Sequence, residues 1–435
     1  MERKIVTTLE NWQKQASGKP LLLHGARQVG KTYSVLDFGR THYATTLYVS
    51  LEDSRDYAAV FERDLDPDRI VRELAALTGQ VVLPQNTLIV LDEVQACPRA
   101  LTSLKYFAEH PTPYHVIATG SLLGIAVRQT SEPYSFPVGK VEMLTMFPLD
   151  FEEFCWAVGQ KPLLSLIQEG FESRRAMTGH DQALDLYRRH LAIGGMPEVV
   201  AMYTGQDDLN QVIAAQKRLN DSAVADMVKY ATPVETARIM AAWSSIPAQL
   251  AKDNRHFQYS VVRPGARASQ YDWAIQWLVS AGLVVNVPKV SQGRLPLAAH
   301  VEAGVFKLYM HDSGVLSAKL ELPLRQMMDS PQIVSGFAGA LTENYVAQTL
   351  AAHQITPYTW SSPGKAEVDF VYQTQAGDIV PIVVKSTDNV RSRSLARFAE
   401  LYHPRETVRV STRNFGFDNG IRSVPLYAVW LLGNQ

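Results

Sequence analysis

Residues 21–33 read LLLHGARQVGKTY, a short apolar run that leads into a loop bounded by glycines. Gly25, Gly30, Lys31 and Thr32 match the spacing G-x-x-x-x-G-K-[ST]. Glycines in such a loop let successive backbone N–H groups converge on a phosphate at a helix N-terminus, whose dipole favours negative charge. The stretch therefore predicts a strand, a phosphate-binding loop and a helix, in that order.

The side chains of this loop indicate which phosphate compound it would hold. The ammonium of Lys31 would reach the β- and γ-phosphates of a nucleotide, and the hydroxyl of Thr32 would hold Mg²⁺. ATP and Mg²⁺ are therefore the predicted cofactors. The loop residues expected to bind them are Gly25, Ala26, Arg27, Gln28, Val29, Gly30, Lys31, Thr32 and Tyr33.

A second stretch, NTLIVLDE at 86–93, has four apolar residues followed by two acids. Asp92 and Glu93 would emerge at the C-terminal end of a buried strand, where open α/β sheets bind ligands. Neighbouring strand residues point to opposite faces, so the two carboxylates can serve different purposes. We expect Asp92 to contact Mg²⁺ and Glu93 to polarise the attacking water. Ser121, with Thr119 as a second candidate, follows another strand and is expected near the γ-phosphate.

Strand-like and helix-like segments alternate over the first 150 residues. Short apolar runs predict strands, and segments with apolar residues at helical spacing predict the helices between them. This alternation favours a parallel sheet covered on both faces, which is an α/β fold. The strands are expected in KPLLLHG, TTLYVSLE, NTLIVLDE and YHVIATG, and the helices in DPDRIVRELAALTG and PRALTSLKYFAEH.

Composition sets wider limits. A chain of 435 residues has room for about three domains. The net charge is −1, so only a local patch would attract nucleic acid or a membrane surface. Its two cysteines cannot form a disulfide framework and fit a reducing compartment. The most apolar long stretch, YDWAIQWLVSAGLVVNVP, carries Asp272, and the N-terminus lacks a signal-peptide core. We therefore expect a soluble, cytoplasmic protein without a membrane partner.

Several motifs together resemble a known group, the prokaryotic AAA-type P-loop ATPases with a winged-helix-like segment and a C-terminal domain of unknown function. The resemblance implies a Walker A loop at 25–32, the Walker B pair at Asp92 and Glu93, sensor 1 at Ser121, and a homo-oligomer. The motifs that carry it are GARQVGKT, TLIVLDEVQACP, SLKYFAEHPTPYHVIATGSLLG, SFPVGKVEMLTMFPLDFEEF, GGMPEVV, FKLYMHDSGVLSA, GALTENYVAQTL, AEVDFVYQ and IVPIVVKS.

ATP hydrolysis of this kind needs a positive charge on the γ-phosphate in the transition state, often supplied by a neighbouring subunit. The sequence does not choose among its candidates, and a solvated basic residue is the alternative interpretation for each. These candidates are Arg128, Lys140, Arg188 and Arg189.

The middle segment, from about 226 to 320, predicts a helix, a short link, a helix and a strand, which is the order of a winged helix. Winged helices can place a recognition helix in the DNA major groove, but others bind protein, so both kinds of partner stay open. The side chains considered for contact with a phosphate backbone are Arg255, Arg263 and Arg267, with His256, Tyr259 and Tyr271 beside them.

The C-terminal segment resembles the PD-(D/E)xK nuclease fold in its order of helices and strands. Glu343, Asp369 and Lys385 match three positions of that site, but Val383 stands where a metal-binding carboxylate is required. Glu367 shares a face with Asp369 and is a displaced substitute. We therefore expect a degenerate nuclease-like site without cleavage activity.

Three functions follow from these patterns. The leading one is an AAA-type ATPase that drives conformational work in an oligomer, with nucleic acid as a candidate partner. The alternatives are an ATP-regulated nuclease, which Val383 argues against, and an ATP-binding interaction scaffold with negligible turnover, which an intact Glu93 argues against. The predicted parts are a P-loop ATPase domain at 1–160, a helical lid at 161–225, a winged-helix-like domain at 226–320 and a restriction-endonuclease-like α/β domain at 321–435.

Overall fold

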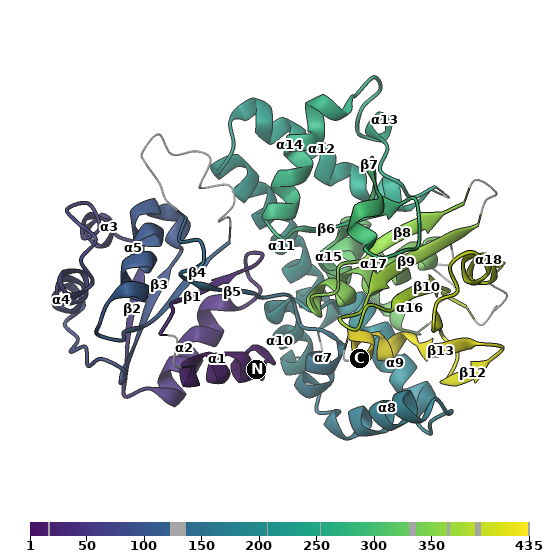
Figure 1. The fold of residues 1–435 in the computed structure, drawn as a ribbon, viewed down its shortest axis with the longest axis horizontal. Helices are drawn as coiled ribbons and strands as arrows, with labels where there is room; N and C mark the ends of the chain where they lie inside the picture. The colour runs from purple at the N-terminus through teal and green to yellow at the C-terminus, as the bar shows by residue number, and fades with distance from the viewer. Residues whose placement is uncertain are drawn as a thin grey trace. The chain divides into compact units, whose positions relative to one another are not determined.

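The computed structural model divides the chain into two compact units, drawn in Figure 1. The N-terminal unit is residues 3–147 with 280–282, and the C-terminal unit is residues 1–2, 148–279 and 283–435. Within the ranges described here, no helix is long and apolar enough to cross a membrane. Those ranges are 1–15, 18–121, 136–206, 208–252, 254–329, 336–362, 366–387 and 393–433.

The N-terminal unit contains a parallel sheet with the order β2-β3-β4-β1-β5 among its described residues. This confirms the expected α/β fold with a parallel sheet. Because β4 lies between β1 and β3, the ends of these three strands meet at one edge. The elements are α1 (Ile5–Lys14), β1 (Leu21–His24), α2 (Lys31–His42), β2 (Thr45–Ser50), α3 (Arg55–Ala59), α4 (Pro67–Thr78), β3 (Thr87–Asp92), η1 (Val94–Ala96), α5 (Pro98–Glu109), β4 (His115–Gly120) and β5 (Glu142–Thr145).

Different helices cover the two faces of this sheet. Ile89 and Leu91 of β3 belong to a buried apolar cluster with residues of α4 and α5. Leu88 and Val90, which point to the opposite face, are also buried. Helix α2 covers that face, and Gly39 allows its close approach, because a Cβ there would lie 3.2 Å from Leu88 Cδ2. Both faces are therefore covered, as a parallel sheet requires.

The C-terminal unit begins with helices and ends with strands. Helices α9, α11, α15 and α16 pack against one another, and α17 packs on β6, β7 and β10. Its helices are α7 (Phe151–Ala157), α8 (Lys161–Ser173), α9 (His180–Ile193), α10 (Pro197–Gln206), α11 (Leu209–Lys229), α12 (Pro233–Leu250), α13 (Tyr259–Val262), α14 (Ala268–Ser280), α15 (Ser313–Lys319), α16 (Leu324–Asp329), α17 (Ala338–Ala352) and α18 (Arg393–Tyr402), with the 3₁₀ helices η2 (Leu297–His300) and η4 (Leu426–Gly433).

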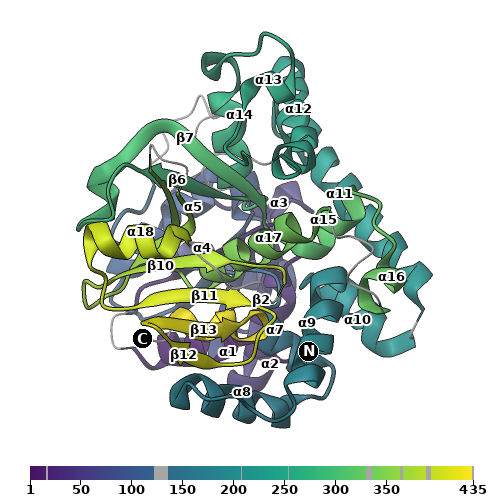
Figure 2. The ribbon, with the colours of Figure 1, turned by 90° about the vertical axis from the view of Figure 1, so that its right-hand side faces the viewer.

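A mixed sheet with the order β12-β13-β11-β10-β9-β8-β6-β7 runs through the described part of this unit, and Figure 2 shows several of its strands side by side. Strands β10, β11 and β13 are parallel to one another, whereas β8, β9 and β10 alternate in direction. The strands are β6 (Val284–Val290), β7 (Val301–Met310), β8 (Tyr358–Ser361), β9 (Glu367–Gln373), β10 (Ile379–Val384), β11 (Thr407–Ser411), β12 (Gly416–Asp418) and β13 (Ile421–Pro425).

Strand β6 pairs with β8, so the strands of the middle segment belong to the same sheet as the C-terminal strands. The structure thus groups residues on both sides of the predicted boundaries at 225 and 320 into one compact unit. The local pattern of helix, helix and strand in the middle segment could not reveal this pairing, because it depends on residues about 70 positions away.

Two motifs of the C-terminal unit meet at one carboxylate. Asp312 Oδ2 accepts a hydrogen bond from the backbone N–H of Gly195 at 2.6 Å, and its Oδ1 caps α15 through Val315 N–H at 2.9 Å. Gly194 has φ 81°, and a Cβ there would lie 2.2 Å from Asp312 Oδ1. Gly194 of GGMPEVV therefore allows close packing against residues 311–314, HDSG.

An apolar run near the C-terminus has the composition that predicts a buried strand, but only its start is one. The apolar run VPLYAVWL at 424–431 is strand only to Pro425, and Leu426–Gly433 forms the 3₁₀ helix η4. All its residues from Leu426 to Leu432 are buried. A continuous apolar run does not distinguish a buried strand from a buried helix, because neither leaves a polar face.

Candidate functional site

The loop after β1 has the backbone that its glycines predict. Gly25 has φ 148°, and a Cβ there would lie 2.2 Å from the carbonyl oxygen of Met146, so the position accepts only glycine. Gly30 has φ 94° and immediately precedes α2. The loop therefore opens directly onto the N-terminus of a 12-residue helix, where backbone N–H groups are free of helical partners.

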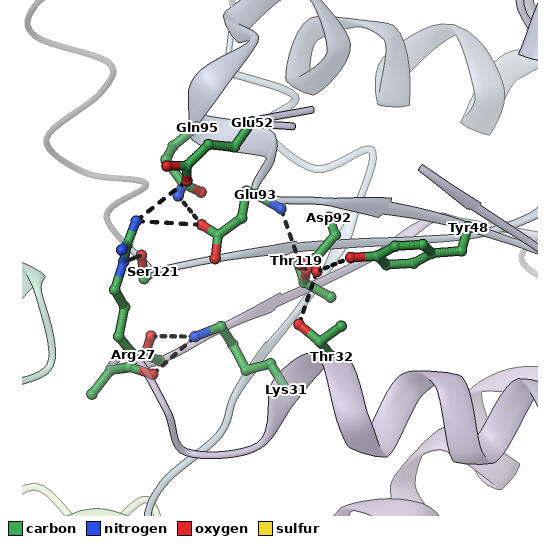
Figure 3. A network of polar contacts seen from close by, with 12 residues as sticks. Arg27, Lys31, Thr32, Tyr48, Glu52, Asp92, Glu93, Gln95, Thr119 and Ser121 are labelled. Carbon is green, nitrogen blue, oxygen red and sulfur yellow. Dashed lines mark hydrogen bonds and ion pairs between the residues drawn. The ribbon is translucent and has the colours of Figure 1, made fainter. Parts of the chain in front are cut away.

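Lys31 is folded over the loop and is 7% exposed. Its Nζ donates to the carbonyl oxygens of Gly25 at 3.0 Å and Ala26 at 2.9 Å (Figure 3). Burial lowers the pKa of His24, and the positive charge of Lys31 lowers it further. The Nε2 of His24 lies 2.9 Å from Thr145 Oγ1. His24 is therefore neutral beside the charged Lys31.

Asp92 brings the two predicted motifs together. Its Oδ2 accepts hydrogen bonds from Thr32 Oγ1 at 2.8 Å and from the Tyr48 hydroxyl at 2.9 Å. Its Oδ1 accepts from Thr119 Oγ1 and from the backbone N–H of Glu93. Burial and the negative charge of Asp92 raise the pKa of Tyr48, so this hydroxyl stays a donor. The residues expected to share Mg²⁺, Thr32 and Asp92, are thus direct neighbours.

Glu93 has an unusual backbone for a residue with a side chain. It adopts the left-handed conformation with φ 52° and ψ 44°, which costs on the order of 1–2 kcal/mol outside glycine. Its side chain turns away from Asp92, and its Oε2 accepts a hydrogen bond from Gln95 Nε2. Strain of this kind persists where the surrounding structure imposes it, and it is frequent at functional sites.

Arg27 of the loop bridges the acids and the end of β4, as Figure 3 shows. Its guanidinium lies 3.5 Å from Glu52 Oε2 and 4.0 Å from Glu93 Oε2, and its Nε lies 3.4 Å from Ser121 Oγ. Ser121 is buried directly after β4, and Arg27 contacts both it and Glu93, while its role near the γ-phosphate stays a prediction. Of the remaining loop residues, Gln28 has φ 64° and Tyr33 is 59% exposed.

Sequence reasoning missed several residues of this site. Arg3 is buried and donates to the carbonyl oxygens of Val29 at 2.9 Å and Phe147 at 2.7 Å, so it links the loop to the segment that follows β5. Tyr48 and Glu52 were also not anticipated. The predicted strand TTLYVSLE contains Tyr48, and this strand, β2, pairs with β3, which ends at Asp92.

The basic residues considered for the γ-phosphate are dispersed. Lys140 pairs with Glu109 at 2.9 Å, and Arg189 pairs with Asp185 at 2.8 Å. Arg188 is half-buried on α9, and Arg128 lies outside the described residues. Within the described part of the N-terminal unit, the ion pair of Lys140 joins it to α5 and not to the loop.

Several side chains of the middle segment that were considered for contact with a phosphate backbone are engaged or buried within the protein. Arg255 forms an ion pair with Glu343 instead of facing solvent, and Tyr271 is 7% exposed. The hydroxyl of Tyr259 donates to Asp272 at 2.7 Å. Arg263 and Arg267 are exposed, and both precede α14. Arg255, one of the three arginines considered for a phosphate backbone, is thus held by a buried carboxylate.

Glu343 and Asp369 are brought together with a residue that the sequence did not suggest. Lys307, on β7, is 1% exposed, and its Nζ lies 2.7 Å from Glu367 Oε1 and 3.9 Å from Glu343 Oε2. The Tyr309 hydroxyl donates to Glu343 Oε2 at 3.1 Å. We call Arg255, Lys307, Tyr309, Glu343, Glu367 and Asp369 the charge cluster.

Electrostatics keep Lys307 ionised within the charge cluster. Burial alone would lower the pKa of Lys307, but the negative charges of Glu343, Asp369 and Glu367 outweigh burial and raise it. Burial, followed by the charge of Glu343, raises the pKa of Asp369 to about 7. Asp369 Oδ2 also accepts a hydrogen bond from Val384 N–H at 2.7 Å. An internal ammonium thus lies among the carboxylates.

The other two residues of the nuclease-like motif lie at the end of β10. Val383 is 2% exposed and belongs to an apolar cluster that includes Trp360, Leu395 and Phe398. Lys385 follows the strand, is half-buried, and its backbone N–H donates to Val410 O at 2.8 Å. The valine is therefore a core residue beneath α18.

Comparison with protein families covers most of the chain in three parts. Residues 17–155 match the AAA domain family (AAA_14). Residues 184–326 and 338–429 match two domains of unknown function (DUF8612 and DUF4143). A comparison with curated proteins found no match. The expectation of an AAA-type P-loop ATPase-like domain is thereby confirmed, while the winged-helix-like and nuclease-like assignments stay predictions.

Among solved structures, the chain is similar to the Walker-type ATPase PABY2304 of Pyrococcus abyssi, with 12% identity and a TM-score of 0.44 over 73% of this chain and 95% of that one. It is also similar to the ORC2 protein of Aeropyrum pernix in ADPNP–ADP complexes, with 14% identity and a TM-score of 0.34 over 76% and 94%. A third is the Aeropyrum pernix ORC1 protein in complex with DNA, with 14% identity and a TM-score of 0.30 over 75% and 94%.

Proposed function

We propose that this protein binds Mg·ATP at the loop of residues 25–33 and hydrolyses it, and that turnover drives conformational work in a homo-oligomer. The observation that carries the proposal is the convergence on Asp92 of Thr32 from the loop and Thr119 from the neighbouring strand. An ordinary glycine turn would not require a buried carboxylate next to the hydroxyl that follows its lysine.

The residues fit the predicted ligands. The glycine at position 25 leaves the loop backbone room that a Cβ would fill, and the helix N-terminus behind it favours an anion. Thr32 Oγ1 and the Asp92 carboxylate, 2.8 Å apart, are the oxygen donors that Mg²⁺ prefers. Mg²⁺ supplies charge neutralisation on the phosphate oxygens.

The chain's own residues account for the reaction. Lys31 would exchange the carbonyl oxygens of Gly25 and Ala26 for phosphate oxygens, which keeps its charge solvated in both states. Glu93 would accept a proton from water as its oxygen attacks the γ-phosphorus. The bond between that phosphorus and the bridging oxygen breaks, ADP leaves with the electron pair, and inorganic phosphate is released.

Replacing Lys31 by alanine should abolish nucleotide binding, because the charge of the triphosphate is left uncompensated at a site built around this ammonium. Binding of a fluorescent ATP analogue and steady-state release of phosphate measure the effect. Lys14→Ala, at an exposed lysine of α1 in the same unit, is the control and should bind as the unmodified protein does. Equal binding and turnover in all three proteins would rule out the assignment of the loop.

The partner of the proposed motor is either a nucleic acid or a protein. Arg263 and Arg267 are the exposed basic residues near α14 that support a nucleic-acid partner. Turnover measured with double-stranded DNA, single-stranded DNA and RNA tests it, with the double variant Arg263→Ala, Arg267→Ala alongside. Stimulation that falls in the double variant supports contact through this segment, and absence of stimulation by any nucleic acid favours a protein partner.

We further propose that residues 321–435 carry a nuclease-like fold without nuclease activity. The order α17, β8, β9, β10, α18, β11, with β10 and β11 parallel, supports the fold. The charge cluster supports the loss of activity, because Lys307 supplies the positive charge that a metal ion would bring. Val383 adds no ligand, since it lies in the apolar core.

The protein is expected to leave DNA and RNA uncut in Mg²⁺ and in Mn²⁺. Val383→Glu should also fail to cleave and should lose stability, because its carboxylate would enter the apolar cluster of Trp360 and Phe398. Gel assays of plasmid DNA, oligonucleotides and RNA, with thermal unfolding in parallel, measure both effects. Cleavage by the unmodified protein that disappears in Asp369→Ala would contradict the proposal.

A further inference from the structure

Arg27 is the basic side chain that the phosphate loop itself places at the reacting end of the site. Its guanidinium contacts Glu93, the proposed water-polarising residue, and Ser121, the residue at the end of β4 (Figure 3). Lys31 lies on the same loop but points to the carbonyl oxygens of Gly25 and Ala26. The loop therefore carries two cations with different directions, of which only Arg27 lies on the side of Glu93.

We propose that Arg27 supplies in cis the positive charge that stabilises the γ-phosphate during hydrolysis, and that it restrains Glu93 until the nucleotide arrives. The proposal rests on the ATPase function above and adds a catalytic residue to it. It places the positive charge for the γ-phosphate within the loop itself, whereas the sequence did not choose among Arg128, Lys140, Arg188 and Arg189.

The charges around Arg27 explain why it is held near this position. Glu52 and Glu93 both face its Nη2, at 3.5 Å and 4.0 Å, and both side chains are partly exposed. Ion pairs of this length and exposure are weak, typically worth about 1 kcal/mol or less. A triphosphate oxygen offers a closer and more highly charged partner, and the planar guanidinium can bind two oxygens at once.

Transfer of Arg27 to the phosphate would also change Glu93. Its carboxylate would lose the contact with Arg27 and keep the hydrogen bond from Gln95, which leaves one of its oxygens free to face the attacking water. ADP lacks the γ-phosphate, so it should not draw Arg27 away from the acids. Arg27 would thus couple water activation to the presence of a third phosphate.

Arg27→Ala is expected to lower ATP turnover by about 100-fold or more, since an arginine on the transferred phosphate is worth about 10³–10⁵ in rate in related reactions. It should also weaken ATP binding relative to ADP binding, because the lost contact is to the γ-phosphate alone. Arg27→Lys should be intermediate, as it keeps the charge but not the fork. Arg63→Ala, which removes an exposed guanidinium of the same unit, should change neither turnover nor the ATP to ADP affinity ratio.

Mixing separates a cis from a trans role. Arg27→Ala protein combined with Lys31→Ala protein should stay inactive, because the first lacks its own cation and the second cannot bind ATP. Recovery of turnover in the mixture would overturn the cis assignment. Full turnover with an unchanged ATP to ADP affinity ratio in Arg27→Ala alone would overturn the inference altogether.

The affinity ratio keeps the two proposals distinguishable. If the unmodified protein shows no turnover, the proposed ATPase function fails. The ratio still tests whether Arg27 contacts the γ-phosphate, because it depends on binding only. An unchanged ratio then rejects the role of Arg27, and a reduced ratio supports the contact.

Discussion

Replacing Glu93 by glutamine is expected to lower ATP turnover by about 100-fold or more while nucleotide binding persists. The amide has the size of the carboxylate but cannot accept the proton of the attacking water. Because the left-handed backbone at this residue costs glutamine as much as glutamate, the site should keep its shape. Asp92 and Thr32 are unchanged, so the proposed Mg²⁺ ligands are retained.

The measurement is phosphate release under single-turnover conditions, together with the fraction of bound ATP that survives gel filtration. We expect the variant to retain ATP and to accumulate in an assembled state, because binding is uncoupled from hydrolysis. Glu109→Gln is the matched control, since this acid pairs with Lys140 at the surface of the same unit. Wild-type turnover in Glu93→Gln would show that another group polarises the water.

Replacing Lys307 by methionine is expected to destabilise the C-terminal unit by about 3–5 kcal/mol. Methionine keeps most of the volume of the side chain but leaves Glu367 and Glu343 without the ammonium that lies between them. The loss of one partner from a buried ion pair costs more than the pair itself contributes, because the remaining charge stays desolvated. Chemical denaturation followed by tryptophan fluorescence measures the free energy of unfolding.

Two further variants make this prediction specific to the charge cluster. Lys289→Met removes a lysine from the neighbouring strand β6, whose partner Glu302 is 34% exposed, so we expect a cost of about 1 kcal/mol or less. Glu367→Gln added to Lys307→Met should recover part of the lost stability, because one unpaired carboxylate is removed. Equal destabilisation by both lysine variants, with no recovery in the double variant, would contradict the role of Lys307.

Much of the N-terminal unit could be predicted from local spacing. The strands that contain Leu22 and Ile89 were readable because each is a short apolar run bounded by a glycine or by acids. The parallel sheet followed from the alternation of these strands with helices. Strand β5, by contrast, carries half-buried and exposed residues, so it lacks the apolar run that would have predicted it.

The C-terminal unit was less predictable because its sheet joins strands from distant parts of the chain. The pairing of Lys289 with Thr359 extends the sheet across the predicted boundary at 320. Glu343 and Asp369 were identified from their positions in a motif, but their surroundings were not. Arg255, which was considered for contact with a phosphate backbone, forms an ion pair with Glu343, 88 positions further along the chain.

Local spacing was enough to identify the phosphate loop and its acidic partner, because Lys31 and Thr32 begin α2 directly after the loop and Asp92 ends β3. Such local geometry is set by backbone sterics and short-range spacing. Which charged side chains contact one another, by contrast, depended on the tertiary fold. Arg27 faces Glu93, and Lys307 lies among acids from α17 and β9, because folding brings distant residues together wherever burial makes an unpaired charge costly.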